Sequence, residues 1–290
     1  MTPRLSSPIH SAILGEARRG AQPRVVFLHG LFGRGKNFTS IAAALAPEAM
    51  SLLVDLPNHG RSGWTDQFDY LEIADLVAQH LREGFAADGP VDVVGHSMGG
   101  KVAMVLALRH PGLVRRLVVI DIAPVGGAAS RGNFRQLLDA LAEVRLERLE
   151  RRADADVVLR ERIPEDAVRG FLLQNLRRDG DGFRWEPNLA LLRAELDAVM
   201  GFPDTGDLRF TGPVLWIGGE RSDYVADGDE PSMRALFPRT RRVTVRGAGH
   251  WVHADAPDIV VEALRRFLIS DAPAGAAAPG SSGDDRPRAG

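Results

Sequence analysis

The sequence has 290 residues, of which 44% are hydrophobic, and its 36 lysines and arginines nearly match its 38 aspartates and glutamates, for a net charge of −2. A chain of this size can bury the core of one large α/β domain or of two small ones. Its balanced charge gives no electrostatic reason to propose nucleic acid or an anionic membrane surface as a partner. The absence of cysteine excludes disulfides, a cysteine nucleophile and thiolate metal sites.

Targeting signals are weak in this sequence. No apolar run approaches the roughly 20 residues that a membrane span needs, and the N-terminus lacks the apolar core of a secretory signal. Arg4, Arg18 and Arg19 with several serines resemble a transit peptide, but Glu16 and two prolines argue against a clean amphipathic helix. We therefore expect a cytoplasmic protein without a membrane span, and the sequence leaves its oligomeric state open.

Short apolar runs alternate with helical patterns along the chain. We predict strands at residues 11–14, 24–28, 51–54, 91–94, 117–122, 214–217 and 242–245. We predict helices at residues 37–46, 70–82, 100–110, 230–237 and 257–268. Several strands are continuous runs of valine, isoleucine and leucine, which is typical of strands buried on both faces of a mainly parallel sheet. The repeated strand–helix order predicts an α/β fold, doubly wound around such a sheet.

The alternation is interrupted between residues 126 and 211, where the sequence is charged and helical. The helices expected there are residues 133–151, 164–178 and 187–200. Charge pairs at helical spacing in residues 145–152 (RLERLERR) are typical of a solvated helix face. We interpret residues 126–211 as a helical insertion, the cap, and residues 1–125 and 212–270 as the core domain. Residues 271–290 are rich in Ala, Gly, Pro and Ser and predict a disordered tail.

The sequence GHSMG at residues 95–99 joins a predicted strand to a predicted helix. G-x-S-x-G in a strand–turn–helix context favours a nucleophile elbow, in which a strained turn exposes the serine hydroxyl above the sheet. The flanking glycines remove side chains that would clash in such a turn. Ser97 is therefore the candidate nucleophile, although a tight turn that merely contains serine remains the alternative.

A nucleophilic serine needs a base, which histidine commonly supplies. His250 lies in a glycine-rich loop directly after the last predicted strand, and open α/β sheets place their sites at the carboxyl ends of strands. His253 follows three residues later, but a zinc site would need a third ligand and a supporting motif such as H-E-x-x-H, which is absent from the sequence. We therefore predict His250 as the base and no metal site.

Acyl transfer also needs an oxyanion hole. The strand at residues 24–28 runs into HGLFG, whose glycines let the backbone approach a substrate. The amide of Leu31 is one candidate donor, and the amide of Met98, after the nucleophile, is the second. A phosphate-binding loop is the alternative, but the stretch from Gly30 to Asn37 does not have the G-x-x-x-x-G-K-[ST] spacing.

The acid of the triad has two candidates. Asp121 ends the predicted strand 117–122, and Asp223 follows the predicted strand 214–217. Both lie between Ser97 and His250, so both fit the chain order Ser…Asp…His. Either aspartate can equally be a loop residue that stabilises a turn.

Five motifs occur in order along the chain: HGLFG, VDLPNHGRS, GHSMGGK, VVIDIAP and GAGHWVHAD. Over about residues 9–268 they resemble the α/β-hydrolase superfamily, in particular its small bacterial esterases and the related mitochondrial hydrolases. The resemblance implies Ser97 as nucleophile, His250 as base, and the amides of Leu31 and Met98 as oxyanion hole. Haloalkane dehalogenases and epoxide hydrolases resemble one another in using aspartate where this chain has Ser97, so serine indicates acyl transfer.

The same resemblance bears on the acid. In this branch of the superfamily it can come from the aspartate of IDIAP, here Asp121. The acid position usual elsewhere in the superfamily matches Ser222 better than Asp223. We therefore favour Asp121 and keep Asp223 as the alternative.

The expected function is cleavage of carboxylic esters or thioesters of short to medium acyl groups through an acyl-enzyme on Ser97, without a metal or organic cofactor. The cap is expected to cover the substrate pocket, with its apolar residues divided between helix core and pocket: Phe171, Leu172, Trp185, Leu189, Leu192 and Phe202. The pocket residues we select are Phe32, His96, Trp185 and Trp251. Two alternatives remain: a C–C bond hydrolase with the same triad, and a non-catalytic ligand-binding member of the fold.

Overall fold

The structure is a computed structural model that describes residues 5–16, 22–126 and 131–270. Seven strands form one sheet in the order β1-β3-β2-β4-β5-β8-β9. They are β1 (Ser11–Leu14), β2 (Arg24–Leu28), β3 (Met50–Val54), β4 (Val91–His96), β5 (Val114–Ile120), β8 (Val214–Gly219) and β9 (Thr240–Val245). Only the edge pair β1–β3 is antiparallel among them. The predicted doubly wound, mainly parallel α/β fold is confirmed.

Helices cover both faces of this sheet. The buried side chains of α1 (Thr39–Leu45) and α11 (Pro257–Arg265) share one hydrophobic cluster with one face. Those of α2 (Tyr70–Arg82), α3 (Met98–Arg109) and α9 (Glu230–Leu236) share another with the opposite face. Short helical segments complete the core: η1 (Gly35–Phe38), η3 (Asp227–Asp229), α10 (Val252–Asp255) and η4 (Arg266–Ser270).

The sequence explains the contrast between α2 and α3. Helix α2 buries residues at helical spacing, among them Ile73, Val77 and Leu81, and its N-terminus is capped by Asp69, whose carboxylate accepts from the Leu71 amide at 2.7 Å. Helix α3 is instead buried from its first residue to Leu108, as its almost uninterrupted apolar sequence requires. Helix α3 therefore gives the residue that precedes it, Ser97, a rigid support.

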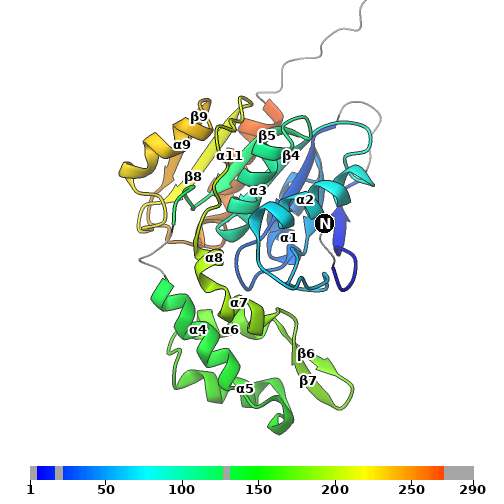
Figure 1. Ribbon diagram of the computed structural model, residues 1–290, viewed down its shortest axis with the longest axis vertical. Coiled ribbons are helices and arrows are strands. Elements are labelled where there is room, and N and C mark those ends of the chain that lie inside the picture. Colours follow the sequence, from blue (N-terminus) through cyan, green and yellow to red (C-terminus); the bar gives the residue numbers. More distant parts are fainter. Residues whose placement is uncertain (1–4, 17–21, 127–130, 271–290) are drawn as a thin grey trace, which may run out of the picture.

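The cap elements occur between β5 and β8 in the chain and lie together beyond one end of the sheet (Figure 1). They are α4 (Arg131–Glu143), η2 (Leu146–Arg148), α5 (Arg152–Arg160), α6 (Asp166–Leu173), the hairpin β6 (Leu176–Asp179) and β7 (Gly182–Trp185), α7 (Leu189–Ala194) and α8 (Leu196–Met200). The domain boundaries at residues 126 and 211 stay a prediction, and the predicted tail at residues 271–290 lies outside the described residues.

Two expectations about the cap are wrong. The expected helix 133–151 ends at Glu143, and charged RLERLERR forms a short turn and the start of α5. The expected helix 164–178 ends at Leu173 because the chain enters the β6–β7 hairpin. Its two-residue loop is Gly180-Asp181, and Gly180 has φ of 56°, a left-handed conformation that glycine adopts without strain.

Buried polar side chains attach the cap to the core. The Lys101 ammonium on α3 donates to the carbonyls of Met200 and Gly201, at 2.8 and 2.7 Å, where α8 ends. The Tyr70 hydroxyl on α2 donates to the Val199 carbonyl at 2.6 Å. These bonds fix the chain where it returns from the cap to the sheet.

Within the described residues, no helix is long and apolar enough to cross a membrane. The cytoplasmic location expected from the sequence stays a prediction.

Candidate active site

Ser97 occupies the turn between β4 and α3 with φ of 53° and ψ of −121°, a conformation that is strained for a residue with a side chain. Its amide donates to the Ile120 carbonyl at 3.0 Å, which holds the turn against β5. A Cβ on Gly95 would lie 2.3 Å from the Gly99 oxygen, and one on Gly99 would lie 2.3 Å from the Leu28 oxygen. Gly95 is therefore required for the close approach of strand β4 to the start of α3, and Gly99 for the close approach of α3 to the end of strand β2.

His250 lies in the loop between β9 and α10, and its Nε2 is 3.0 Å from Oγ of Ser97. The ring of Tyr224 stacks on the imidazole, with centroids 3.8 Å apart and planes at 21°. His96, which precedes Ser97, donates from Nε2 to the His250 carbonyl at 2.9 Å. The histidine is thus held by its backbone and by one ring face, with Nε2 directed at the serine.

Asp121 is the carboxylate in contact with this histidine. Its Oδ2 accepts from Nδ1 of His250 at 2.8 Å, its Oδ1 accepts from the Gly219 amide at 2.9 Å, and Oδ2 also accepts from the Ser222 hydroxyl. Asp121 is completely buried. Asp223 is exposed and, among the described residues, makes no hydrogen bond or ion pair with His250.

One detail at Asp121 differs from the sequence interpretation. Strand β5 ends at Ile120, two residues earlier than expected, and Asp121 is the first residue after it, with φ of 52°. This left-handed conformation is accessible to aspartate at some cost. It turns the chain out of the sheet, and the buried carboxylate is directed to the end of β8 and to His250.

The HGLFG loop lies beside the serine. A Cβ on Gly30 would lie 3.2 Å from Cβ of Ser97. The loop closes as a turn in which the Gly33 amide donates to the Gly30 carbonyl at 2.9 Å and Phe32 has φ of 60°. Neither the Leu31 amide nor the Met98 amide donates a hydrogen bond to any part of the described chain. Met98 is the first residue of α3, where the helix dipole favours negative charge.

Two buried histidines next to the triad are structural and neutral. Burial lowers the pKa of His29, whose Nε2 accepts from the Leu56 amide at 3.0 Å, so that Nδ1 carries the proton and donates to the Gly30 carbonyl at 2.8 Å. Burial lowers the pKa of His96 well below its usual range. His29 therefore supports the HGLFG loop, and His96 supports the His250 loop.

His253 packs between the rings of His96 and Phe38, with centroid distances of 4.4 and 5.0 Å. Burial lowers the pKa of His253 to about 4. The described residues contain no group of three or more His, Cys, Asp or Glu side chains arranged to hold a metal ion. A packing role accounts for His253 in this structure.

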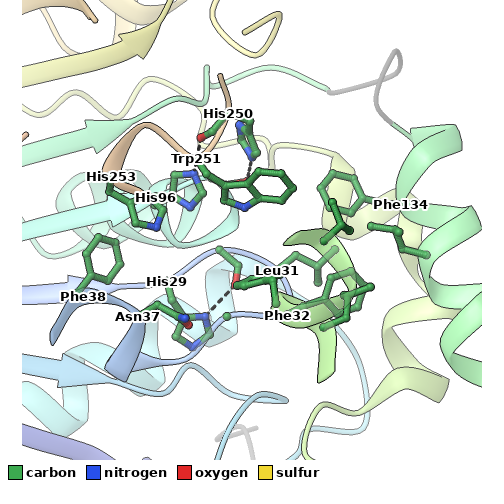
Figure 2. A pocket seen from close by; sticks show the side chains of 17 residues that line it. His29, Leu31, Phe32, Asn37, Phe38, His96, Phe134, His250, Trp251 and His253 are labelled. Carbon is green, nitrogen blue, oxygen red and sulfur yellow. Dashed lines mark hydrogen bonds between the residues drawn. The ribbon is translucent and has the colours of Figure 1, made fainter. Parts of the chain in front are cut away.

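A pocket opens at Ser97 and His250 between the core and the cap (Figure 2). Phe32, His96 and Trp251, which we selected from the sequence, line it. From the cap it is lined by apolar residues of α4 and α6: Phe134, Leu137, Val168, Phe171 and Leu172. Figure 2 shows Phe134 across the pocket from the histidines, and its ring centroid lies 6.4 Å from that of Phe32.

The prediction that Trp185 lines this pocket is wrong. Trp185 ends β7, pairs in register with Leu176 of β6 and is buried in the hydrophobic cluster that the cap shares with α2, α3 and one face of the sheet. Leu189, Leu192 and Phe202 also pack in or against that cluster. Sequence reasoning missed Phe134, Leu137 and Val168, although Phe134 and Leu137 lie on one face of an amphipathic helix. It also missed Tyr224, for which no motif gives a signal.

A serine, histidine and aspartate in hydrogen-bond contact at the carboxyl ends of parallel strands define a class, the hydrolases of the α/β-hydrolase fold. The chain matches the family described as alpha/beta hydrolase fold over residues 23–257, and it belongs to that family. It is a hydrolase of the esterase/lipase type.

Several known proteins are similar to this chain. The mouse sn-1-specific diacylglycerol lipase ABHD11 is 39% identical over 253 residues, which cover 85% of this chain and 81% of the lipase. Esterase YbfF of Escherichia coli strain K12 is 33% identical over 249 residues, 84% of this chain and 92% of the esterase. The solved structure of a marine microorganism esterase superposes with a TM-score of 0.86 at 31% identity, covering 91% of this chain and all of the esterase.

Proposed function

We propose that this protein hydrolyses carboxylic esters through an acyl-enzyme on Ser97. The observation that carries the proposal is the continuous pair of hydrogen bonds from Ser97 to His250 and from His250 to Asp121, at 3.0 and 2.8 Å. A base within hydrogen-bond reach of the nucleophile, oriented by a buried carboxylate, is the arrangement that activates serine.

The chemical steps follow from these contacts. His250 accepts the hydroxyl proton at Nε2 while Ser97 Oγ attacks the ester carbonyl, and Asp121 stabilises the imidazolium. The amides of Leu31 and Met98 donate to the oxyanion of the tetrahedral intermediate. His250 then gives its proton to the leaving alkoxide. Water, deprotonated by the same histidine, then attacks the acyl carbonyl, the bond between this carbon and Ser97 Oγ breaks, and the carboxylic acid leaves while His250 returns its proton to Oγ.

The substrate is an ester with an apolar acyl group of short to medium length. The lining of the pocket on the cap side is apolar, whereas its polar groups are those of the triad and the neighbouring histidines. The similarity to a diacylglycerol lipase and to an esterase supports esters over other acyl compounds. A thioester fits the same site, because only the leaving group differs.

A fluorophosphonate probe tests the nucleophile. It should modify Ser97 and no other serine, and Ser97→Ala should abolish both labelling and the burst of product from an activated ester. Peptide mapping that locates the label elsewhere, or no labelling of the folded protein, would contradict the proposal.

A substrate panel tests the reaction class. p-Nitrophenyl esters of two to twelve carbons and acyl-CoA thioesters should be compared at equal enzyme concentration. We expect turnover of the shorter esters. If Ser97 is labelled but neither series is turned over, while a diketone is cleaved, the protein is a C–C bond hydrolase instead. Binding without any turnover would indicate a non-catalytic member of the fold.

A further inference from the structure

The loop that carries the Leu31 amide is held from the cap as well as from the core. We call residues 30–37 the oxyanion loop. Asn175, between α6 and β6, donates from Nδ2 to the Phe32 carbonyl at 2.7 Å. Glu186, directly after β7, accepts from Nη1 of Arg34 at 3.1 Å. These two contacts bring the hairpin end of the cap against the turn that closes the HGLFG loop.

Both contacts are buried. Asn175 is 2% exposed, Glu186 is 3% exposed and Arg34 is 6% exposed. Since an unpaired buried polar group is unfavourable, these partners are expected to stay bound whenever the cap is in place. Glu186 also accepts from Nε of Arg177 at 2.8 Å, so its carboxylate is held by a residue of β6 as well as by Arg34.

The cap backbone fixes the position of the Asn175 side chain. The backbone N–H of Asn175 donates to the Leu172 carbonyl at 3.0 Å, and the backbone carbonyl of Asn175 accepts from the backbone N–H of Glu186 at 2.9 Å. Asn175 is therefore attached both to the end of α6 and to the end of the hairpin. A change in the packing of these two elements moves the donor that holds Phe32.

The oxyanion loop needs such support because its conformation is unfavourable on its own. Phe32 is a bulky residue with φ of 60°, which side chains of this size rarely adopt. On the core side, the Gly30 carbonyl accepts from both Nδ1 of His29 and the Gly33 amide. On the cap side, the Phe32 carbonyl accepts from Asn175. The Leu31 N–H belongs to the same peptide group as the Gly30 carbonyl, and the Phe32 carbonyl lies two peptide groups further along the loop.

We infer that Asn175 is a positioning residue for the oxyanion hole. The inference rests on the proposed function, in which the Leu31 amide donates to the oxyanion. Asn175 does not touch the reacting atoms. It holds the peptide after Phe32, and thereby the direction of the Leu31 amide, so that the hole is complete only when the cap is docked on the core.

The test compares Asn175→Ala with Asn188→Ala. Asn188 makes a different contact between cap and core, from its Nδ2 to Oδ1 of Asn58 at 3.3 Å, and Asn58 lies outside the oxyanion loop. Both variants weaken the docking of the cap, but only Asn175→Ala frees the Phe32 carbonyl. Thermal unfolding shows whether each variant is folded. If Asn175→Ala does not fold, Asn175→Ser is used in its place, because serine keeps a polar side chain in the buried position.

The measurements are kcat and KM for a p-nitrophenyl ester, and the affinities of two inhibitors. An alkyl boronic acid forms a tetrahedral adduct that needs the oxyanion hole, whereas an alkyl ether of the same length does not. We expect Asn175→Ala to lower kcat by about ten- to a hundredfold with KM within about threefold, because a hole donor acts in the transition state. Boronate affinity should fall by a similar factor and ether affinity should be unchanged. Asn188→Ala should stay within about threefold of the wild type in all four values.

Equal losses in both variants, or an Asn175 variant with unchanged kcat and unchanged boronate affinity, would overturn the inference. Its failure is distinguishable from failure of the proposed function. If the fluorophosphonate does not label Ser97 in the wild type, the proposed function is wrong. If it does and Asn175→Ala behaves as the wild type, only the positioning role is wrong.

Discussion

The hydroxyl of Ser222 donates a hydrogen bond to Oδ2 of Asp121, the same oxygen that accepts from Nδ1 of His250. Ser222 stands in the loop after β8, where the resemblance to the superfamily expects the acid of the triad. Here that loop supplies a hydrogen-bond donor, and the carboxylate comes from the end of the neighbouring strand β5. The Gly219 amide, at the end of β8, donates a hydrogen bond to the second carboxylate oxygen, Oδ1 of Asp121.

Replacing the two candidate acids should separate their roles. Asp121→Asn should reduce kcat by orders of magnitude, up to the roughly ten-thousandfold known for the equivalent change in a serine-protease triad, because the amide no longer holds the required histidine tautomer. Asp223→Asn should change kcat by less than about twofold, since its carboxylate is exposed and, within the described residues, forms no hydrogen bond with His250. Steady-state kinetics on folded variants provide the measurement, and the reverse pattern would assign the acid to the β8 loop.

Moving the carboxylate is a stricter experiment on the same contact. Because Ser222 already touches the carboxylate, an aspartate at 222 is in position to accept from His250 once residue 121 is shortened. The double variant Asp121→Ser/Ser222→Asp should therefore be about tenfold or more faster than Asp121→Ser alone in kcat for an activated ester. A double variant no faster than the single one would show that the two strand ends are not exchangeable.

The order of strands and helices could be predicted from the sequence because buried parallel strands leave continuous apolar runs. Strands β1 and β2 have the predicted bounds, and the others differ by a few residues at their ends. Ser97 and His250 could be selected because motif context and strand ends restrict a nucleophile and its base to few positions. Chain order left Asp121 and Asp223 open, and the resemblance to the superfamily favoured Asp121. The structure brings the three into contact, and their catalytic roles stay a proposal.

The cap could not be predicted in the same detail. Charged and apolar residues alternate in short stretches of its sequence. The hydrophobic periodicity therefore did not distinguish a continuation of the helix from the β6–β7 hairpin. Trp185 was selected as a pocket residue because it is aromatic, but tertiary packing decides which way such a side chain points. Tyr224 lies on His250 only because the β8 loop folds back against it, a contact between residues 26 apart in the chain.

The stacked ring of Tyr224 should matter for turnover. Its centroid lies 3.8 Å from that of His250, and a small displacement of a catalytic group can have a large effect on rate. Tyr224→Leu should lower kcat by about ten- to a hundredfold. Tyr224→Phe keeps the ring face and should retain activity within about threefold. Equal kcat in the leucine and phenylalanine variants would contradict an orienting role.

The cap side chains in the pocket should set the preference for acyl length. Phe134→Ala removes a ring that faces Phe32 across the pocket, so kcat/KM should rise for longer p-nitrophenyl esters relative to the acetate ester. Labelling by a small fluorophosphonate should be unchanged. Trp185→Ala provides the control: it should leave the length preference intact but lower the free energy of unfolding by about 3 kcal/mol, as for a buried aromatic. A shift in preference with Trp185→Ala but not with Phe134→Ala would reverse this assignment.

Lys101 gives the stability of the protein a specific pH dependence. The side chain is 2% exposed, and burial lowers the pKa of its ammonium to about 8. In the unfolded chain the pKa is about 10.5. Tyr70, whose ring lies 5.8 Å from the Lys101 nitrogen, does not ionise in this range because burial raises its pKa.

Between pH 8 and about 10.5 the unfolded state therefore binds more protons than the folded state, and the contribution of Lys101 to the free energy of unfolding rises with pH. Below pH 8 both states are protonated and the contribution is constant. Lys101→Met removes this dependence together with the hydrogen bonds to Met200 and Gly201. Urea unfolding at pH 7.5 and pH 9.5 should show the wild type gaining stability relative to Lys101→Met by on the order of 1–3 kcal/mol, at 1.36 kcal/mol for each unit of pKa difference. A difference that stays constant or shrinks as the pH rises would mean that Lys101 keeps an ordinary pKa, with its ammonium stabilised by the two cap carbonyls despite burial.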